Sequence, residues 1–600
     1  MAPVTVAAGP AVQVDINTGP ASSYVGLREC IAALRAAGAS FGELPHRHAA
    51  EWAELAPDDK PQENPLPLGE IALAASERRL HRESEQVYRV LSVAAAALCA
   101  GTAELGRPLL VSGAGGTDLS SLRGLMRAVE HSRVHPGAAL LLDRPESVRV
   151  PLGPHADYRA ERVRCLRRMD LPITVDDLVL DLPSGAAATA VAPTSEEGKL
   201  YQRARDKDST AVDRVAAALA YCRRAFFSAN WEGMAVVATE AIELLPGVPT
   251  PALSALLATA QREDSLVHAI EFETTILRST ADIRGFLLKV IGIQAGFRGD
   301  QDAAVTAFRA MREHDNGLSP EIRAQSHLYT ALTLSKRKNR LGEAVAEVEQ
   351  GFEVVRERPN EADSVRRERG WLHNLRGLTL FAERRLGPAF AHEKRALACL
   401  AGLSDASSAH LRINLYSNIS VLQEKAGKYS SALATWDKFR QATGSSTAGF
   451  AKHHSYRSAG LRLLVGDRDA AVKEIGTTLT NAVGLNDIFH QTEVRLELGM
   501  LHATAGDREA AVAEYELAEQ DARLLGDPYR IALAQAGQVM TGGAGADVPA
   551  TVANAALSLT RPVEATALAK AVSNSAEFAA LLPKPRTKLN RPFDLINFQD

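Results

Sequence analysis

In the second half of the chain, small, charged and apolar residues return in a fixed order that predicts a repeated pair of helices. A Gly-Asp dipeptide is followed by charged residues, then by two alanines, and then by a helical run. Glycine accepts the left-handed turn that ends a helix, and aspartate caps the start of the next helix. Alanine lets the two helices of a hairpin approach closely. The phrase occurs at residues 299–304, 466–471 and 506–511, with a variant at residues 427–432.

The small residue that opens the second helix of each hairpin sets the spacing of the repeats. These residues are Met234, Ala269, Ala304, Ala344, Ala389, Ala432, Ala471 and Ala511, and neighbours are 35 to 45 residues apart. Two further positions recur at constant offsets. The first helix carries a glycine at its middle (Gly292, Gly377, Gly499), and a bulky residue stands four positions after the small one (Phe308, Trp436, Tyr515).

On these positions the chain resembles the tetratricopeptide repeat superfamily, whose minimal period is roughly 34 residues. The longer spacing is similar to the long-helix variant in large bacterial ATPase-type regulators. The resemblance implies a mainly α fold, with a superhelix of about eight hairpins over residues 211–525 and a smaller mixed α/β domain before it. The alternative is an all-α domain without repeats, but agreement at several offsets in four or more units favours the superhelix.

Residues 1–200 differ from the repeats, because they contain Pro/Gly-rich breaks and short strand-like runs. The stretch 107–125 reads as a buried strand, a turn and a capped helix, and 137–145 reads as another buried strand. It resembles the second half of a signal-transduction ATPase module, in degenerate form, since Ser112 and Gly113 stand where that family has acidic residues. No G-x-x-x-x-G-K-[ST] loop precedes it. A competing interpretation is a dinucleotide- or phosphate-binding turn at Gly113, Gly115 and Gly116, although its spacing misses G-x-G-x-x-G.

The resemblance also predicts a binding groove, because the first helices of such repeats line the concave side of the superhelix. Family positions that usually face the groove fall on Phe286, Lys289, Tyr329, Trp371, Asn374, Asn414, Ser417, His453 and Tyr456, with Asn418 beside that row. An asparagine side chain donates to a C=O group and accepts from an N–H group at once, and aromatic rings hold apolar side chains. The row therefore predicts a polypeptide ligand. The alternative for each residue is packing between repeats.

Composition narrows the classes of function. The net charge of −4 provides no broad field for nucleic acid. The five cysteines are scattered without a C-x-x-C pair, which is typical of reduced thiols rather than of disulfides or a zinc site. The first Arg is Arg28, so no basic signal region is expected, and the apolar run Val90 to Ala100 is too short to cross a bilayer. We therefore expect a cytoplasmic protein without a membrane segment.

The end of the chain has two parts. Residues 526–582 contain a glycine-rich linker and Ala-rich helices, which are expected to cap the array. Residues 583–600 form a tail in which basic residues precede Phe593, Leu595, Ile596 and Phe598. A terminal segment of this apolarity is expected to dock on its own array or on a partner. No DNA-reading helix-turn-helix is visible here.

The sequence thus favours a non-catalytic scaffold or adaptor that binds a peptide or protein in the groove. We predict no catalytic residues, no metal site and no cofactor, because no nucleophile elbow or H-E-x-x-H motif occurs. Two alternatives stay open. The N-terminal domain could be a nucleotide-sensing regulator, or it could be a peptide-modifying enzyme whose repeats recruit the substrate. The oligomeric state is not indicated by the sequence.

Overall fold

Helices make up most of the structure, which is a computed structural model of the chain. It describes residues 9–19, 21–59, 66, 68–71, 83–132, 135, 137–143, 148–151, 157–171, 173–181, 195–228, 230–248, 277–313, 317–336, 338–442 and 448–541. The repeat expected around Ala269 and the tail 583–600 lie outside these residues, as does the expected capping region beyond residue 541.

The N-terminal part contains two small parallel sheets and the helices that cover them. Strands β1 (Val12–Asp15), β2 (Leu109–Ser112) and β3 (Leu140–Leu142) pair in that order, with Val12 opposite Leu109 and Leu109 opposite Leu140. Strands β4 (Val148–Pro151) and β5 (Leu178–Asp181) form the second sheet. The helices described here are α1 (Val25–Ala36), α2 (Leu44–Arg47), α3 (Ala49–Leu55), α4 (Leu68–Ile71), α5 (Glu83–Leu105), α6 (Leu119–Ser132), α7 (Arg159–Arg168) and α8 (Glu196–Arg205). The expected mixed α/β part is confirmed.

Helix α5 is the apolar centre of this part. Its stretch Gln86–Leu105 is the one segment among the described residues that is long and apolar enough to cross a membrane, and 89% of that window is buried inside the molecule. The buried side chains, among them Leu91, Ala94 and Leu98, belong to the main hydrophobic core.

The rest of the described chain consists of antiparallel helical hairpins, so the expected superhelical fold is confirmed. The first (A) and second (B) helices of each hairpin are α9 (Ala211–Phe227) and α10 (Trp231–Leu244), α13 (Thr280–Phe297) and α14 (Gln301–Ala310), α15 (Pro320–Ser335) and α16 (Leu341–Val354), α17 (Asp363–Ala382) and α18 (Leu386–Cys399), α19 (Ala406–Lys425) and α20 (Tyr429–Ala442), α21 (Ala448–Val465) and α22 (Arg468–Gly484), and α23 (Ile488–Ala505) and α24 (Arg508–Leu524), followed by α25 (Pro528–Thr541).

The Gly-Asp phrase forms the turn of the hairpin as its chemistry requires. Gly506 ends α23 with a φ of 84°, a conformation that glycine adopts without steric cost. Asp507 then caps α24, since its Oδ1 accepts from the backbone N–H of Ala510 at 3.1 Å. The same cap is present at Asp300 and Asp467, with Ala303 and Ala470 as donors. Each phrase therefore ends one helix and starts the next.

Behind each turn, a seam of small residues lets the two helices touch. The small residues that open the described B helices, from Met234 to Ala511, are all fully buried. In the last hairpin a Cβ added at Gly499 would stand 2.8 Å from the Tyr515 ring, and at Gly292 a Cβ would meet Phe308 at 2.4 Å. A larger residue at either glycine would force the two helices apart.

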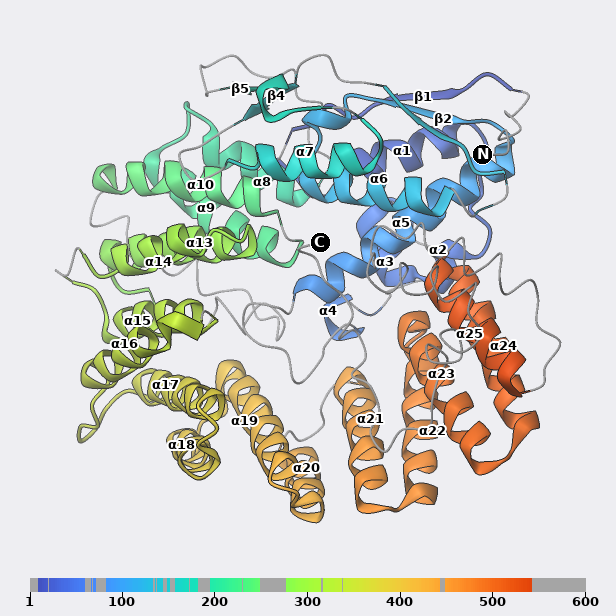
Figure 1. Ribbon diagram of the computed structural model, residues 1–600. Coiled ribbons are helices and arrows are strands. Elements are labelled where there is room, and N and C mark those ends of the chain that lie inside the picture. The colour runs from blue at the N-terminus through green and yellow to red at the C-terminus, as the bar shows by residue number, and fades with distance from the viewer. Residues whose placement is uncertain are drawn as a thin grey trace.

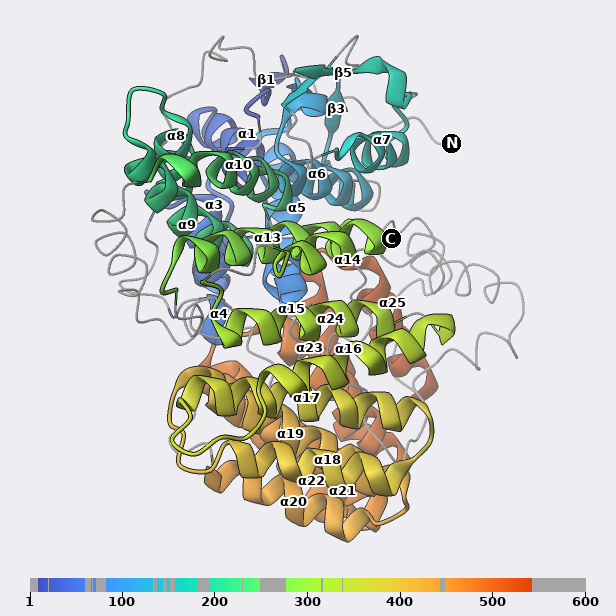
Figure 2. The same ribbon diagram turned by 90° about the vertical axis from the view of Figure 1, so that its left-hand side faces the viewer.

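The hairpins follow an arc, and both ends of the arc meet the N-terminal part (Figure 1). At the start, Arg162 of α7 donates to Glu232 of α10 at 2.5 Å, and the hydroxyl of Ser23 donates at 3.2 Å to the carbonyl of Ser228, directly after α9. At the far end, the Phe489 ring of α23 lies 5.8 Å from that of Tyr88 in α5 and 5.9 Å from that of His48 at the start of α3, and α21 contacts α4 (Figures 1 and 2). Ile488 and Phe489 of α23 even belong to the same hydrophobic core as α5. The N-terminal part therefore closes the arc.

A buried group of charges holds this closing contact, and we call it the clasp: Glu51, Arg89, Lys452, Asp487 and His490. Arg89 of α5 lies 2.8 Å from Oδ1 of Asp487, at the start of α23, and Lys452 of α21 pairs with the same carboxylate. Lys452 also donates to the carbonyl of Ile71 in α4 at 3.0 Å. Burial would raise the pKa of Asp487, but Arg89 and Lys452 hold it well below its usual value. The clasp therefore depends on this one ionised carboxylate.

We predict that Asp487→Asn loosens the closing contact, because it removes the counter-charge that Arg89 and Lys452 share and leaves Arg89 only the carboxylate of Glu51, at 3.4 Å. Removing one partner of a buried pair costs about 3–5 kcal/mol. Amide hydrogen exchange of α5 and α23 should speed up accordingly. Glu353→Gln is the matched control, since Glu353 and Arg356 form an exposed pair of the kind worth less than about 1 kcal/mol. If both variants exchange at wild-type rates in α5 and α23, the clasp does not hold the arc closed.

Candidate functional site

Neighbouring A helices contact one another along the arc, as α13 and α15, α15 and α17, and α17 and α19 do (Figure 1). Polar side chains join these helices on the inner side of the arc. We call this surface the inner wall. From α13 to α25 its cross-links are Lys289–Gln325 (3.2 Å), Gln325–Glu368 (3.1 Å), Asn418–Asn374 (2.8 Å), Arg457–Glu424 (2.5 Å), Lys452–Asp487 and Arg530–Glu493 (2.6 Å). The partners of each cross-link lie about one repeat apart in the sequence, so equivalent positions of neighbouring hairpins bond to one another.

The predicted groove residues of α13 and α15 are sealed into this wall. Phe286, Lys289 and Tyr329 are 0–1% exposed. The Lys289 ammonium stands 5.3 Å from the Phe286 ring centre and 5.8 Å from that of Tyr329, so it is held between two aromatic faces. These three side chains contact one another and the next repeat.

The predicted residues of α17, α19 and α21 are also buried, except for Asn418. Trp371, Asn374, Asn414, Ser417 and Tyr456 are 4–8% exposed, and Asn418 is half-buried. The side chain of His453 lies outside the described residues. The structure thus brings Asn374 and Asn418 together in one hydrogen-bonded pair, near the middle of the arc and away from the N-terminal part (Figure 2).

Two inner-wall residues, Gln325 and Glu368, and one residue buried inside a hairpin, Glu393 of α18, escaped the sequence interpretation. Gln325 and Glu368 continue the ladder that starts at Lys289. Gln325 lies 36 residues after Lys289, and Glu368 lies 43 residues after Gln325. This spacing of one repeat from Lys289 was the signal in the sequence that could have found both residues. Glu393 stands four positions after Ala389, where other repeats carry an aromatic or aliphatic residue. The signal in the sequence was the departure of this one position from the bulky residues at 308, 436 and 515.

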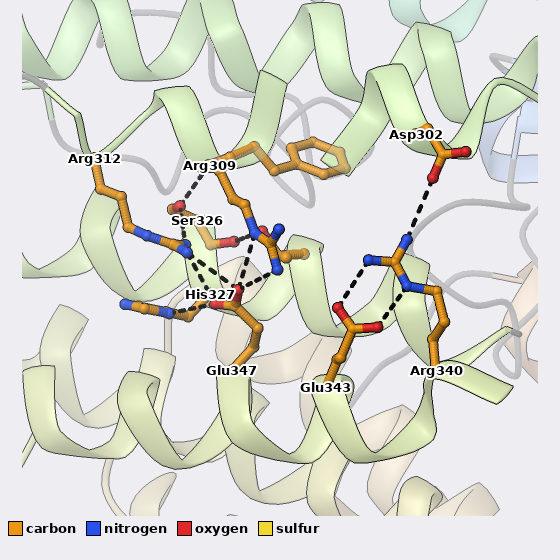
Figure 3. A network of polar contacts seen from close by, with 10 residues as sticks. Asp302, Arg309, Arg312, Ser326, His327, Arg340, Glu343 and Glu347 are labelled. Atoms are coloured by element: carbon orange, nitrogen blue, oxygen red, sulfur yellow. Dashed lines mark hydrogen bonds and ion pairs between the residues drawn. The ribbon is translucent and has the colours of Figure 1, made fainter. Parts of the chain in front are cut away.

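A second network fixes the curvature between α14, α15 and α16 (Figure 3). Oε1 of Glu347 in α16 accepts from Arg309 at 3.0 Å. Oε2 accepts from Arg312 at 3.1 Å and lies 2.8 Å from Nδ1 of His327 in α15. Arg312 also reaches Ser326 at 2.9 Å, beside the inner wall. Burial opposes ionisation of Glu347, but His327 and Arg312 lower its pKa to about 2. Three helices are therefore tied to one carboxylate.

The glycine turn after β2 is filled by the protein's own groups. Asp118 accepts from the backbone N–H of Tyr24 at 2.9 Å and of Ser121 at 2.9 Å, so one carboxylate caps both α1 and α6. Arg162 donates to the carbonyls of Gly115 and Thr117. Helix N-terminal N–H groups bind phosphate when they are unbonded. The Asp118 carboxyl already occupies the N–H groups of Tyr24 and Ser121 at the starts of α1 and α6, which weakens the interpretation of a phosphate site there.

The hairpins stack on one another, and hydrogen bonds join equivalent positions of neighbouring hairpins. This arrangement is a superhelix of the tetratricopeptide type joined to a small α/β part. No protein-family model matches the chain, and no curated protein matches it.

Similar solved structures include a signal transduction ATPase with numerous domains and a tetratricopeptide repeat sensor from Pyrococcus horikoshii. It is 11% identical, with 95% of this chain and 88% of that chain covered and a TM-score of 0.38. Aspartyl phosphate phosphatase F from Bacillus subtilis is 12% identical, with 55% and 89% covered and a TM-score of 0.32. A Rap protein complexed with competence and sporulation factor is 13% identical, with 55% and 93% covered and a TM-score of 0.31. Similarity at these scores supports no statement about function.

We predict that Glu347→Gln destabilises the array and that the effect disappears in acid. The folded-state pKa of about 2 lies below the ordinary value of 4.5, so the contribution is fully present above about pH 4.5 and is lost as the pH falls toward 2. The difference in unfolding free energy between wild type and variant should be about 2–3 kcal/mol at pH 6. Denaturant titrations over this pH range measure it. A difference that stays constant down to pH 2.5 would contradict the network.

Proposed function

We propose that this protein is a non-catalytic scaffold that binds an extended polypeptide on the inner wall, along α17, α19 and α21. One observation carries the proposal: the Asn374–Asn418 pair joins two A helices at a place where the Asn418 amide is partly exposed on the inner wall. Asn414 and Ser417, each 8% exposed, lie on the same helix, α19.

The chemistry of these groups suits a polypeptide main chain. A backbone offers one N–H and one C=O group per residue, and an asparagine amide satisfies both kinds at once. Trp371 and Tyr456 are 4–5% exposed and belong to the hydrophobic clusters that hold these helices, so the proposed contacts with the ligand are polar. A charged small molecule would need a protein side chain of opposite charge to bind it here. The nearby Glu424 and Arg457 already form an ion pair with each other at 2.5 Å, which disfavours such a ligand.

The closed arc supports binding by preorganisation. The clasp and the inner-wall ladder hold the A helices in one arrangement before a ligand arrives, so less entropy is lost on binding. In this proposal residues 1–200 act as the part that closes the arc, residues 211–525 bind, and residues 526–582 cap. The proposed location is the cytoplasm, and the five cysteines, all free thiols, fit a reducing compartment.

We predict that Asn374→Ala and Asn414→Ala each weaken the binding of a selected peptide about five- to tenfold, because each removes about 1 kcal/mol of hydrogen bonding. The peptide is obtained by panning a random 12-residue display library against the full chain, and its affinity is measured by fluorescence anisotropy.

Asn339→Ala is the matched control, since Asn339 is exposed beyond the end of α15 and away from the inner wall. It should bind the peptide as the wild type does. Peptides that bind all three variants with equal affinity would place the site elsewhere, and a library that yields no binder would reject the proposed function.

A further inference from the structure

One position in each hairpin is reserved for a side chain that fills the space between the two helices. It lies four residues after the small residue that opens the B helix. In five described hairpins it holds an apolar or aromatic side chain that is at most 2% exposed: Phe308, Val348, Trp436, Ile475 and Tyr515. In the α17–α18 hairpin the same position holds Glu393, which is fully buried.

The carboxyl of Glu393 is pressed against the backbone of α17. A Cβ added at Gly377 would stand 2.6 Å from its Oε1 and 3.1 Å from its Cδ. Among the described residues neither carboxyl oxygen has a hydrogen-bond partner of good geometry. A buried polar group in this state lowers stability, and five sibling hairpins show that apolar residues fill the position well. Residues that oppose local stability in this way often serve function.

A polar neighbour of Glu393 belongs to the proposed site. Burial raises the pKa of Glu393 well above its usual value, and the Asn418 amide of α19 is the group that acts against the rise. Asn418 at the same time donates through Nδ2 to Oδ1 of Asn374 at 2.8 Å. The Asn418 amide therefore lies between the inner wall and the buried acid.

We propose that Glu393, as a neutral carboxylic acid, is a positioning residue that keeps the Asn418–Asn374 pair in its binding arrangement, so that ligand binding requires Glu393 to be protonated. A neutral carboxylic acid is a weak hydrogen-bond acceptor, so the Asn418 amide keeps its hydrogen bond to Oδ1 of Asn374. An ionised carboxylate is a much stronger acceptor for an N–H group, so it draws the Asn418 amide into the hairpin and away from Asn374. This inference rests on the proposed function for the identity of the site.

The direction of the pH effect follows from this geometry. The folded-state pKa lies above the unfolded value, so the contribution of Glu393 to stability is present in acid and is lost as the pH rises toward the folded-state pKa. The binding arrangement should be lost over the same range. The nearby pair His373 and His392 packs against Phe352, and burial lowers the pKa of each to about 4, so neither changes charge as the pH rises from 5.

Two variants test the inference in the full chain. Glu393→Gln keeps the shape of the side chain but cannot ionise, and Glu393→Met fills the position as the sibling hairpins do. The ligand is the selected peptide, made without ionisable side chains and with both ends blocked. Between about pH 5 and 10, peptide affinity of the wild type should fall at least about fivefold, while both variants should change by less than about twofold. A wild-type profile that matches the Gln variant would overturn the inference.

A second readout needs no ligand. In protein with ¹⁵N-labelled asparagine, the side-chain resonance of Asn418, assigned by its loss in Asn418→Ala, should move with pH in the wild type and stay fixed in Glu393→Gln. A resonance that does not move in the wild type overturns the role of Glu393, even if peptides bind. A resonance that moves while no peptide binds at any pH rejects the proposed function and leaves the positioning of the pair by Glu393 supported.

Discussion

A helical hairpin buries its apolar face only against a neighbour, so an array of hairpins is stable but its curvature is free until something fixes it. In this protein the buried charges around Asp487 supply that constraint. Arg89 from the N-terminal part and Lys452 from the array meet on one carboxylate, and the hydrophobic core of α5 continues into α23. The last repeats are thereby anchored to the same part of the chain as the first ones. The repeats between them have one arrangement available.

The closed arc also determines which side chains meet on the inner wall. Because the arc is closed, neighbouring A helices meet at constant spacing, and one polar side chain per repeat reaches the next. Near the start of the arc these bonds are sealed by aromatic residues, as around Lys289. At α17 and α19 the same geometry leaves amides with residual exposure. The structural part of the wall around Lys289 and the proposed site at α17 and α19 therefore have the same fold. They differ in the side chains that cover equivalent positions.

Much of the fold could be predicted from sequence, because the signals were local. Gly506 and Asp507 specify a turn by backbone conformation and capping, and Ala511 specifies close helix packing. The closure of the arc could not be predicted, since Arg89 and Asp487 are almost 400 residues apart and nothing local marks them as partners. The groove row was only partly informative for the same reason. Position on an A helix was predictable, whereas exposure of Phe286 or Tyr329 depends on neighbouring repeats.

The central claim is that the inner wall at α17, α19 and α21 receives an extended polypeptide while the N-terminal part keeps the arc closed. Hydrogen exchange of the full chain with and without a bound library-selected peptide tests it most directly. The account predicts that exchange slows in α17, α19 and α21 and is unchanged in β2 and α6. Slowing confined to β2 and α6, or to the outer B helices α18 and α20, would contradict it.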